Sequence, residues 1–336
     1  MNKIDLKKVR KVLIVRFGKI GDIVVTSFVF EVLKANFPEM EINLLTFKSN
    51  REVLRCNPNV NKVYYSSNPI SFLWNILRLN TLHLDMLLDL NDNPSTTSSI
   101  IYRLIRCNIK TGYNFSKYSG LLDLHINQLS QVNSHIIERM RNYLLQLGFS
   151  INDNLVKPYF YLDTRIFTQI QTELLNVKKE HSIIAINISA GNDIRYWKTE
   201  SWIELINFIN NTNNKVYFVL LSTEEDKSLR DKISTGINNN QVIDARNYSI
   251  QYFASYLKMA DLIISPDTSA VHIASAFGIP VLALYPNFLW NFVSWQPYNV
   301  YYKSIKSKSE KVKDIPVHEV FDAYNKLISL YNIKLK

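Results

Sequence analysis

Residues 11–22 read Lys-Val-Leu-Ile-Val-Arg-Phe-Gly-Lys-Ile-Gly-Asp, and this stretch decides the fold class. Its continuous apolar run from Val12 to Val15 predicts a short parallel strand that is covered on both faces. The glycines at 18 and 21 allow a tight turn whose backbone can approach a ligand closely. The apolar stretch 23–37 predicts a helix that ends at Pro38. A strand, a glycine-containing turn and a helix in this order indicate a doubly wound α/β domain.

Strand and helix patterns alternate along both halves of the chain. Further strands are predicted at 41–46, 61–65, 86–90, 183–188, 215–221, 261–265 and 281–285. Further helices are predicted at 134–147, 163–180, 201–211, 224–234, 251–259, 268–277 and 317–331. Gly148 is expected to close the first of these, and the polar helix 163–180 is interpreted as the inter-domain region. Because the alternation occurs twice, the sequence predicts two α/β domains with parallel sheets.

Length and composition are consistent with this organisation. The 336 residues exceed one ordinary core, and 47% of them are hydrophobic. The formal net charge of +10 favours anionic partners such as a phosphorylated glycolipid, an inner-membrane surface or nucleic acid, although a merely solubilising surface is equally compatible with it. Cys56 and Cys107 have no metal-type spacing, which favours a reduced, cytoplasmic chain. No signal peptide or spanning segment is visible, so any membrane contact is expected to be peripheral.

In doubly wound sheets, ligands bind beyond the carboxyl ends of the strands. Ligand-binding residues are therefore expected in the turns 16–22, 89–94, 189–198, 221–225 and 265–269. In the first of them Asp22 stands where the helix begins. It can be a simple helix cap, or a carboxylate that takes a proton from a hydroxyl group.

The turn at 265–269 precedes a helix of small residues. Thr268 and Ser269 suit a helix cap, and the exposed N–H groups of such a helix start form an anion site for a diphosphate. Capping alone would also explain Asp267 and Thr268. His272 follows one turn later, and a core histidine is the simpler interpretation of it on local grounds.

Two further turns carry charged residues. After Gly191, the cations Arg195 and Lys198 can neutralise phosphate, or can simply belong to a solvated basic loop. Beyond the strand at 215–221, Glu224 and Glu225 can accept hydrogen bonds from ribose hydroxyls, or can complement a helix dipole.

Several kinds of site are excluded by the sequence itself. It contains no GxGxxG dinucleotide fingerprint, no P-loop, no HExxH or GxSxG motif, no Cys/His cluster and no DxD triplet. We therefore expect no metal and no cofactor. Aromatic and basic residues do not alternate in the manner of a nucleic-acid-binding sheet surface, so nucleic acid is not an expected partner.

Three segments together resemble glycosyltransferase family 9, the ADP-heptose–lipopolysaccharide heptosyltransferases. They are the opening strand and G-x-x-G-D turn at 12–26, the segment 187–202, and the run 264–285, which is similar to the family's D-T-G-x-x-H-x-A-A-x-G-x-P pattern. The resemblance implies a GT-B fold, with two Rossmann-like domains facing a central cleft. It implies an acceptor domain at 1–165, a donor domain at 166–316 and a helix at 317–336 that packs back on the first domain.

The resemblance also assigns roles. It implies an inverting, metal-independent transfer of a heptose or related sugar from a nucleotide-sugar donor, ADP-heptose by analogy, to an anionic glycolipid or glycan acceptor. Asp22 matches the family's general base. The donor contacts correspond to Arg195 or Lys198, Glu224 or Glu225, Asp267, Thr268, Ser269 and His272.

Two departures from the family pattern concern the donor. Ser269 replaces the family's glycine, and its side chain would keep the backbone farther from the diphosphate. The aromatic segment 286–298 replaces a small turn, and we interpret it as core rather than as a base-stacking surface. A non-catalytic nucleotide-sugar-binding member of the family is the alternative function.

Overall fold

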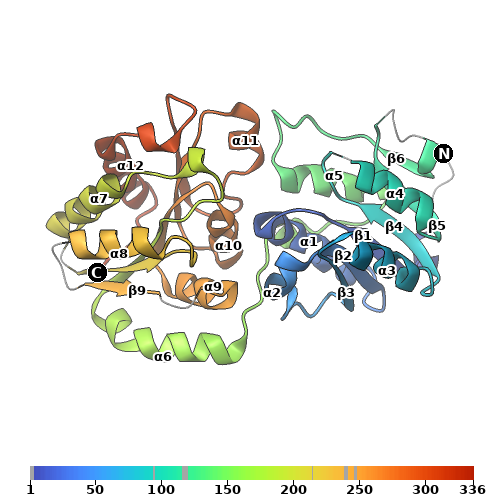
Figure 1. Ribbon diagram of the computed structural model, residues 1–336, viewed down its shortest axis with the longest axis horizontal. Helices are drawn as coiled ribbons and strands as arrows, with labels where there is room; N and C mark the ends of the chain where they lie inside the picture. The colour runs from blue at the N-terminus through green and yellow to red at the C-terminus, as the bar shows by residue number, and fades with distance from the viewer. Residues whose placement is uncertain (1–3, 94, 116–119, 214, 238–240, 246–247) are drawn as a thin grey trace. The chain divides into compact units, whose positions relative to one another are not determined.

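The structure is a computed structural model that describes residues 4–336 other than 94, 116–119, 214, 238–240 and 246–247. The chain divides into two compact units, Met1–Tyr161 and Leu162–Lys336. Each unit contains one six-stranded sheet with helices on both faces (Figure 1). The predicted fold class, two doubly wound α/β domains, is thus confirmed.

The first unit contains six strands and five α-helices in its described part. The strands are β1 (Lys11–Val15), β2 (Glu41–Phe47), β3 (Lys62–Ser66), β4 (Leu84–Asp89), β5 (Cys107–Tyr113) and β6 (Leu124–Ile126). The helices are α1 (Ile20–Asn36), α2 (Arg51–Leu54), α3 (Pro69–Leu79), α4 (Thr96–Leu104) and α5 (Ile136–Leu147). Gly148 ends α5 with a φ of 93°, a left-handed conformation that glycine adopts without strain, as expected from the sequence.

The first sheet has the strand order β3-β2-β1-β4-β5-β6, and its strand pairs are parallel. The chain reverses its direction of winding between β1 and β4, which is the Rossmann order. On one face α3 and α4 pack over a core that includes Leu13, Leu87 and Ile101. On the other face α1 contacts α5.

The second unit repeats this plan. Its strands are β7 (Ser182–Asn187), β8 (Val216–Leu221), β9 (Val242–Asp244), β10 (Leu262–Pro266), β11 (Val281–Tyr285) and β12 (Tyr302–Lys306). Its helices are α6 (Thr164–Glu180), α7 (Thr199–Thr212), α8 (Lys227–Gly236), α9 (Ile250–Met259), α10 (Ser269–Phe277), α11 (Leu289–Ser294) and α12 (Val317–Leu330). The parallel order β12-β11-β10-β7-β8-β9 places the reversal between β7 and β10.

The last helix belongs to the core of the second unit. Val320, Tyr324 and Leu327 of α12 are buried in the same hydrophobic cluster as Trp202 and Leu205 of α7. The helix that the sequence set apart from the donor domain at 166–316 is therefore part of the second unit. The apolar face of α12 covers β11 and β12, which a helix following the last strand can reach directly.

The unit boundary lies slightly before the expected one. It falls between Tyr161 and Leu162, whereas the sequence placed it at 165/166. The helix α6, interpreted as the inter-domain region, is part of the second unit, where it packs against α9 and β7.

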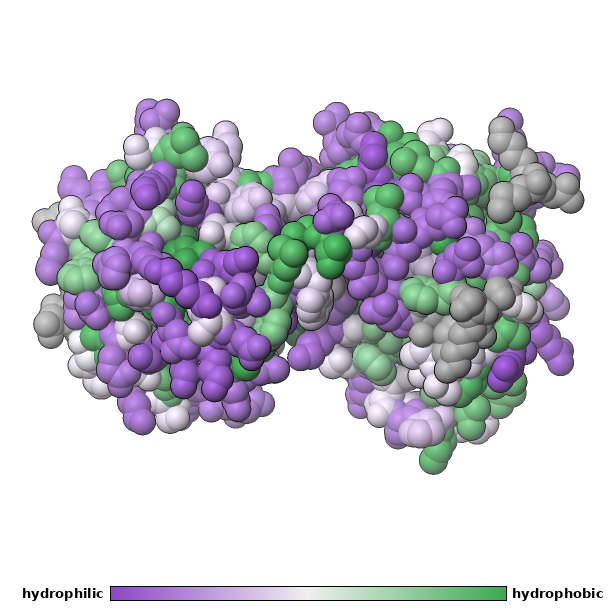
Figure 2. All heavy atoms as spheres, turned by 90° about the horizontal axis from the view of Figure 1, so that it is seen from above, coloured by the Kyte–Doolittle hydropathy of each residue, from purple (hydrophilic) through white to green (hydrophobic). Residues whose placement is uncertain are grey.

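The surface drawn in Figure 2 is mostly hydrophilic, with hydrophobic residues forming smaller patches among the polar ones. Scattered exposed apolar residues are ordinary in a globular protein. Among the described residues, no helix is long and apolar enough to cross a membrane.

Candidate functional site

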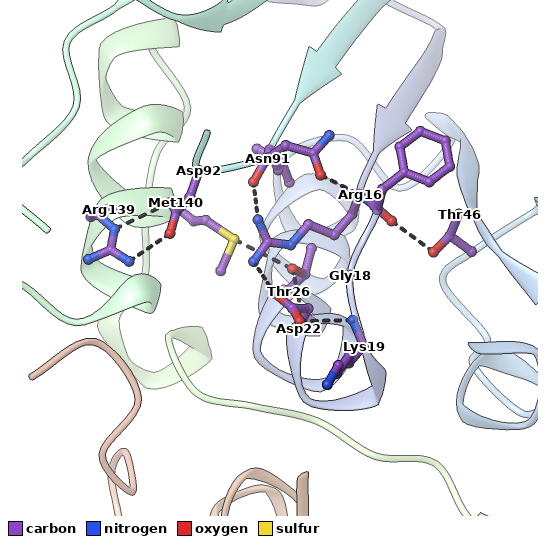
Figure 3. A network of polar contacts seen from close by, with 12 residues as sticks. Arg16, Gly18, Lys19, Asp22, Thr26, Thr46, Asn91, Asp92, Arg139 and Met140 are labelled. Carbon is purple, nitrogen blue, oxygen red and sulfur yellow. Dashed lines mark hydrogen bonds and ion pairs between the residues drawn. The ribbon is translucent and has the colours of Figure 1, made fainter. Parts of the chain in front are cut away.

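The first group of polar residues lies at the switch point of the first sheet. Residues 16–22 follow β1 and residues 90–92 follow β4, and these two strands are neighbours. Their carboxyl ends therefore meet at one edge of the sheet, where doubly wound proteins bind ligands. Figure 3 shows the resulting network of side chains.

Asp22 is held by two donors on the first turn of α1. The Arg16 guanidinium donates through Nη2 to Oδ1 of Asp22 at 2.8 Å, and the backbone N–H of Lys19 donates to Oδ2 at 2.9 Å (Figure 3). The side chain of Asp22 keeps 24% of its surface exposed. Since each carboxylate oxygen has two lone pairs, Asp22 can still accept a hydrogen bond from a ligand hydroxyl. It therefore supports the helix start and remains accessible.

Gly18 is required by the position of Asp22. A Cβ at residue 18 would lie 2.5 Å from both Cβ and Cγ of Asp22 and 2.8 Å from Oδ2. The carboxylate side chain therefore lies directly against the glycine backbone. Asn50 fixes the same turn, because its amide donates to the Gly18 carbonyl at 2.9 Å. Gly21 lies inside the first turn of α1.

Arg16 connects Asp22 to the sheet. Only 2% of Arg16 is exposed, and its Nη1 donates to the Leu90 carbonyl. Its own carbonyl accepts from the Thr46 hydroxyl at 2.8 Å. Arg16 is thus a buried cation that orients Asp22. No role was predicted for Arg16, although a cation directly after an apolar strand is a recognisable signal in the sequence.

Two further carboxylates, Asp89 and Asp92, lie at the carboxyl end of β4. Asp89 is buried and accepts from the Tyr102 hydroxyl and from Asn91, and burial raises the pKa of Asp89 against the opposing effect of these hydrogen bonds. Asn91 in turn accepts from the Phe17 N–H at 2.8 Å, which fixes the start of the Asp22 turn. Asp92 forms a bidentate ion pair with the buried Arg139, at 2.7 and 3.3 Å.

The second group lies at the switch point of the second sheet, after β7 and β10. Asp267 is buried and accepts at Oδ2 from the Asn291 amide at 2.6 Å. Arg195 lies 3.3 Å from the same oxygen and donates to the Asp267 carbonyl at 3.1 Å. Burial raises the pKa of Asp267, whereas Arg195 and Asn291 lower it. Of the two cations left open by the sequence, Arg195 is the one that reaches the Asp267 turn.

The start of α10 is organised by Thr268 and Asn187. Thr268 is the N-cap, and its hydroxyl accepts from the Ala270 N–H at 3.3 Å. Asn187, the last residue of β7, donates to the hydroxyls of Ser265 and Thr268, each at 3.0 Å. Ser269 is the first residue of the helix and is only partly buried. Serine is accommodated there because no left-handed backbone is needed at a first helical position.

The other residues predicted to contact the donor differ in their exposure to solvent. His272 is buried in α10 with its ring 5.7 Å from that of Trp295. Lys198 is exposed and precedes α7, and Gly191 is exposed in the turn after β7.

Glu224 and Glu225 are both exposed in the turn after β8, and a backbone hydrogen bond and Thr223 lower the pKa of Glu225. The neighbouring Asp226, which the sequence analysis did not single out, accepts from the Tyr196 hydroxyl at 2.9 Å. That contact links the turn after β8 to the turn that carries Arg195.

The aromatic segment 286–298 is only partly core, which corrects the sequence-based interpretation. Leu289 and Trp290 of α11 are exposed, whereas Asn291 is buried against Asp267. Tyr285 donates to the Trp295 carbonyl at 2.8 Å, which anchors the end of this segment. Asn291 could not be predicted from local sequence because its partner Asp267 lies 24 residues away.

Comparison with known proteins agrees with the resemblance noted in the sequence. The sequence model of glycosyltransferase family 9 (heptosyltransferase) matches residues 75–324. Lipopolysaccharide heptosyltransferase 3 of Escherichia coli strain K12 is 24% identical over 294 residues, which cover 83% of this chain and 82% of that relative.

Solved structures share the fold over nearly the whole chain. The family 9 glycosyl transferase of Veillonella parvula DSM 2008 superposes with a TM-score of 0.83 at 16% identity, covering 96% of this chain and 98% of its own. The E. coli ADP-heptose lps heptosyltransferase II superposes with a TM-score of 0.76 at 17% identity, covering 96% and 99%. At these identities the superpositions show a common fold.

Proposed function

Because this chain belongs to glycosyltransferase family 9, the heptosyltransferases, we propose that it transfers a heptose or a related sugar from a nucleoside-diphosphate donor to a lipopolysaccharide core or related glycan. ADP-heptose is the proposed donor, and its support is the name of a structural relative, the E. coli ADP-heptose lps heptosyltransferase II. No cofactor takes part in the proposed reaction, which is placed in the cytoplasm.

The observation that carries the proposal is the setting of Asp22. Its carboxylate is fixed by Arg16 and by the Lys19 N–H and stays partly exposed beyond β1. In the proposed step Asp22 accepts the proton of an acceptor hydroxyl. The acceptor oxygen forms a bond to the anomeric carbon as the bond from that carbon to the diphosphate oxygen breaks. The nucleoside diphosphate leaves with the electron pair, and a single displacement inverts the anomeric centre.

The proposed donor contacts lie in the second unit. The N-terminus of α10 and the Arg195 cation would stabilise the negative charge that develops on the diphosphate. Arg195 is preferred to Lys198 because it lies at the Asp267 turn, 3.3 Å from the Asp267 carboxylate. Glu224 or Glu225 would accept hydrogen bonds from the ribose. His272 is proposed to support the donor site from within α10.

Turnover tests the proposal directly. The purified chain is incubated with ADP-heptose and a lipopolysaccharide core that lacks its heptose, and the mass of the glycan and the release of ADP are measured. We expect a mass increase of one heptose, and a loss of roughly 10²- to 10⁴-fold in kcat for Asp22→Asn. The control is Asp153→Asn, which replaces an exposed carboxylate that pairs with Arg141.

Three outcomes would contradict the proposal. Binding of ADP-heptose without any turnover would favour the alternative of a non-catalytic nucleotide-sugar-binding protein. Full activity of folded Asp22→Asn would remove Asp22 as the base. A product with retained anomeric configuration, determined by NMR, would exclude the single displacement.

A further inference from the structure

Helix α3 carries a row of exposed apolar side chains on one face. Ile70, Leu73, Trp74 and Leu77 are 69%, 52%, 60% and 60% exposed. Their spacing of three and four residues places them side by side along the helix. Apolar residues at this spacing normally face a core, so an exposed row of them indicates a surface for a partner. We call these four residues the α3 stripe.

The α3 stripe is held outward by a rigid helix. The opposite face of α3 is buried through Ile76 and Leu79, which belong to the core beneath α3 and α4. The Asn68 side chain caps the helix by accepting from the Ser71 N–H at 2.8 Å. Because Ile76 and Leu79 are already buried on the inner face, the α3 stripe could turn inward only if α3 lost its packing on the sheet.

Basic residues lie near the C-terminal end of the stripe. Arg78 on α3, Arg103 on α4 and Arg106 after it are all exposed. The Asn80 amide donates to the Leu104 carbonyl at 2.9 Å, and the Arg106 N–H donates to Asn80 at 2.8 Å, so the ends of α3 and α4 lie side by side. Leu104, itself exposed, extends the apolar surface there.

Acidic residues are absent from the same stretches of sequence. Neither 61–84 nor 93–122 contains an aspartate or a glutamate. The next acidic residue after α3, Asp85, accepts the backbone N–H groups of Arg10 and Lys11 at 2.8 and 2.9 Å. The outer surface of α3 and α4 therefore combines exposed apolar groups with cations.

We propose that the α3 stripe and its three flanking arginines dock this chain on an anionic phospholipid bilayer. A helix with an apolar face and flanking cations lies in the interface, with the apolar side chains among the upper acyl chains and the cations at the phosphates. The formal net charge of +10 adds long-range attraction to the same surface.

The charge pattern favours a bilayer over a second copy of the chain. A twofold dimer would bring the same surface of each copy together. Such an interface would contain the arginines of both copies, and 61–84 and 93–122 supply no acidic partner for them. An anionic lipid surface satisfies both the apolar stripe and the cations.

The helix α3 also contacts the turn that carries Asp22. The ring of Phe17 lies 4.9 Å from Phe47, which is exposed, and 6.2 Å from Phe72 of α3. Aromatic side chains thus connect the Asp22 turn with the helix that bears the stripe. This last step rests on the proposed function: docking here would bring a membrane-embedded glycolipid acceptor to the unit that holds Asp22.

Vesicle co-sedimentation of the whole chain tests the docking surface. Vesicles of phosphatidylcholine are compared with vesicles that also contain phosphatidylglycerol, in the absence of donor. We expect binding to the anionic vesicles that weakens with salt. Trp74→Ser with Leu77→Ser should lower the partition coefficient by at least about tenfold, because two apolar side chains no longer leave water. Arg78→Gln should lower it about fivefold on anionic vesicles alone.

Matched controls keep the test specific. Leu175→Ser with Leu330→Ser removes two exposed leucines of the second unit and should leave vesicle binding unchanged. All variants replace exposed side chains, and circular dichroism confirms that they are folded. The proposal is overturned if the chain does not bind anionic vesicles, if the control loses as much binding as the stripe variant, or if the stripe variant only converts a dimer into a monomer.

The docking and the chemistry can fail separately. Transfer to a short, water-soluble core oligosaccharide measures the reaction without a membrane. Vesicle binding without any transfer would refute the proposed function and leave the docking surface intact. Transfer without vesicle binding would refute the docking surface and leave the proposed function intact.

Discussion

A methyl group at position 18 would collide with Asp22. In Gly18→Ala the new Cβ would lie 2.5 Å from Cβ and Cγ of Asp22, whereas carbon atoms in ordinary contact are about 3.5 to 4.0 Å apart. Gly18 has no left-handed backbone that only glycine could adopt, so the change acts through this contact. Asp22 must therefore move by about 1 Å, out of its hydrogen bonds with Arg16 and the Lys19 N–H.

The expected loss of activity follows from that displacement. A misplacement of about 1 Å at a reacting group can reduce the rate by about 100-fold, which corresponds to about 2.7 kcal/mol of activation free energy. Overpacking of the turn should also lower the free energy of unfolding by about 1 to 3 kcal/mol. Donor affinity should not change, because the proposed donor contacts belong to the other unit.

The assay compares kcat for heptose transfer, the Kd for ADP and the melting temperature in Gly18→Ala and in Gly120→Ala. Gly120 is the matched control, since a Cβ there meets no atom of the described residues within 4 Å. We expect Gly120→Ala to keep the wild-type kcat. An unchanged kcat in folded Gly18→Ala would refute the reasoning that this contact places the base. A weakened Kd for ADP with unchanged kcat would refute it as well.

Three further predictions concern the partners of Asp22 and Asp267. Arg16→Met should lower the free energy of unfolding by about 2 to 3 kcal/mol, because it leaves the Asp22 ion pair without its buried cation; urea denaturation measures this, and an unchanged midpoint would contradict it. Asn291→Ala should weaken ADP binding and lower stability by about 1 to 3 kcal/mol, because buried Asp267 loses its amide donor; calorimetry and thermal melting test this, and wild-type values in both would contradict it. Arg195→Met should raise the pKa of Asp267 further, since Arg195 now lowers it against the effect of burial. An acid whose pKa is raised in the folded state loses stability as pH rises from its unfolded value of about 3.9 through its higher folded value. This loss should be larger in the variant when urea midpoints are compared between acidic and neutral pH, and an equal loss in both proteins would contradict the prediction.

Metal independence gives a last prediction. Because the proposed charge stabilisation comes from Arg195 and the start of α10, treatment with EDTA should leave the rate of transfer unchanged. The measurement is kcat with EDTA and after readdition of magnesium. A rate that EDTA abolishes and magnesium restores would contradict a metal-independent reaction.

Local sequence patterns determined the fold class and the location of the polar turns. Apolar runs such as Val12–Val15 and Val281–Tyr285 predict buried strands because a parallel strand needs apolar residues on both faces. Gly18 and Gly148 each mark a turn. Gly18 is needed because the Asp22 side chain lies against its backbone, and Gly148 because its backbone is left-handed. The turns at 16–22 and 265–269 could be found because ligand sites in such sheets follow the carboxyl ends of strands.

Elements with weak or mixed local signals were not predicted. The helix α3 was left unassigned because its apolar residues lie on both faces, buried at Ile76 and Leu79 and exposed along the α3 stripe. The short strand β6 and the partly exposed β12 lack a continuous apolar run. Burial, which decides how such segments are used, is a property of the packed chain.

Only the tertiary structure determined which residues meet. Asn291 reaches Asp267 across 24 residues, and Arg16 reaches the Leu90 carbonyl across 74. The packing of α12 on its own sheet likewise depends on contacts between segments far apart in the chain. Sequence periodicity records the direction in which a side chain points from its own element, and it contains no information about the element that lies opposite. The sequence by itself therefore determined the kinds of residue at each strand end, and the folded sheets decided their partners.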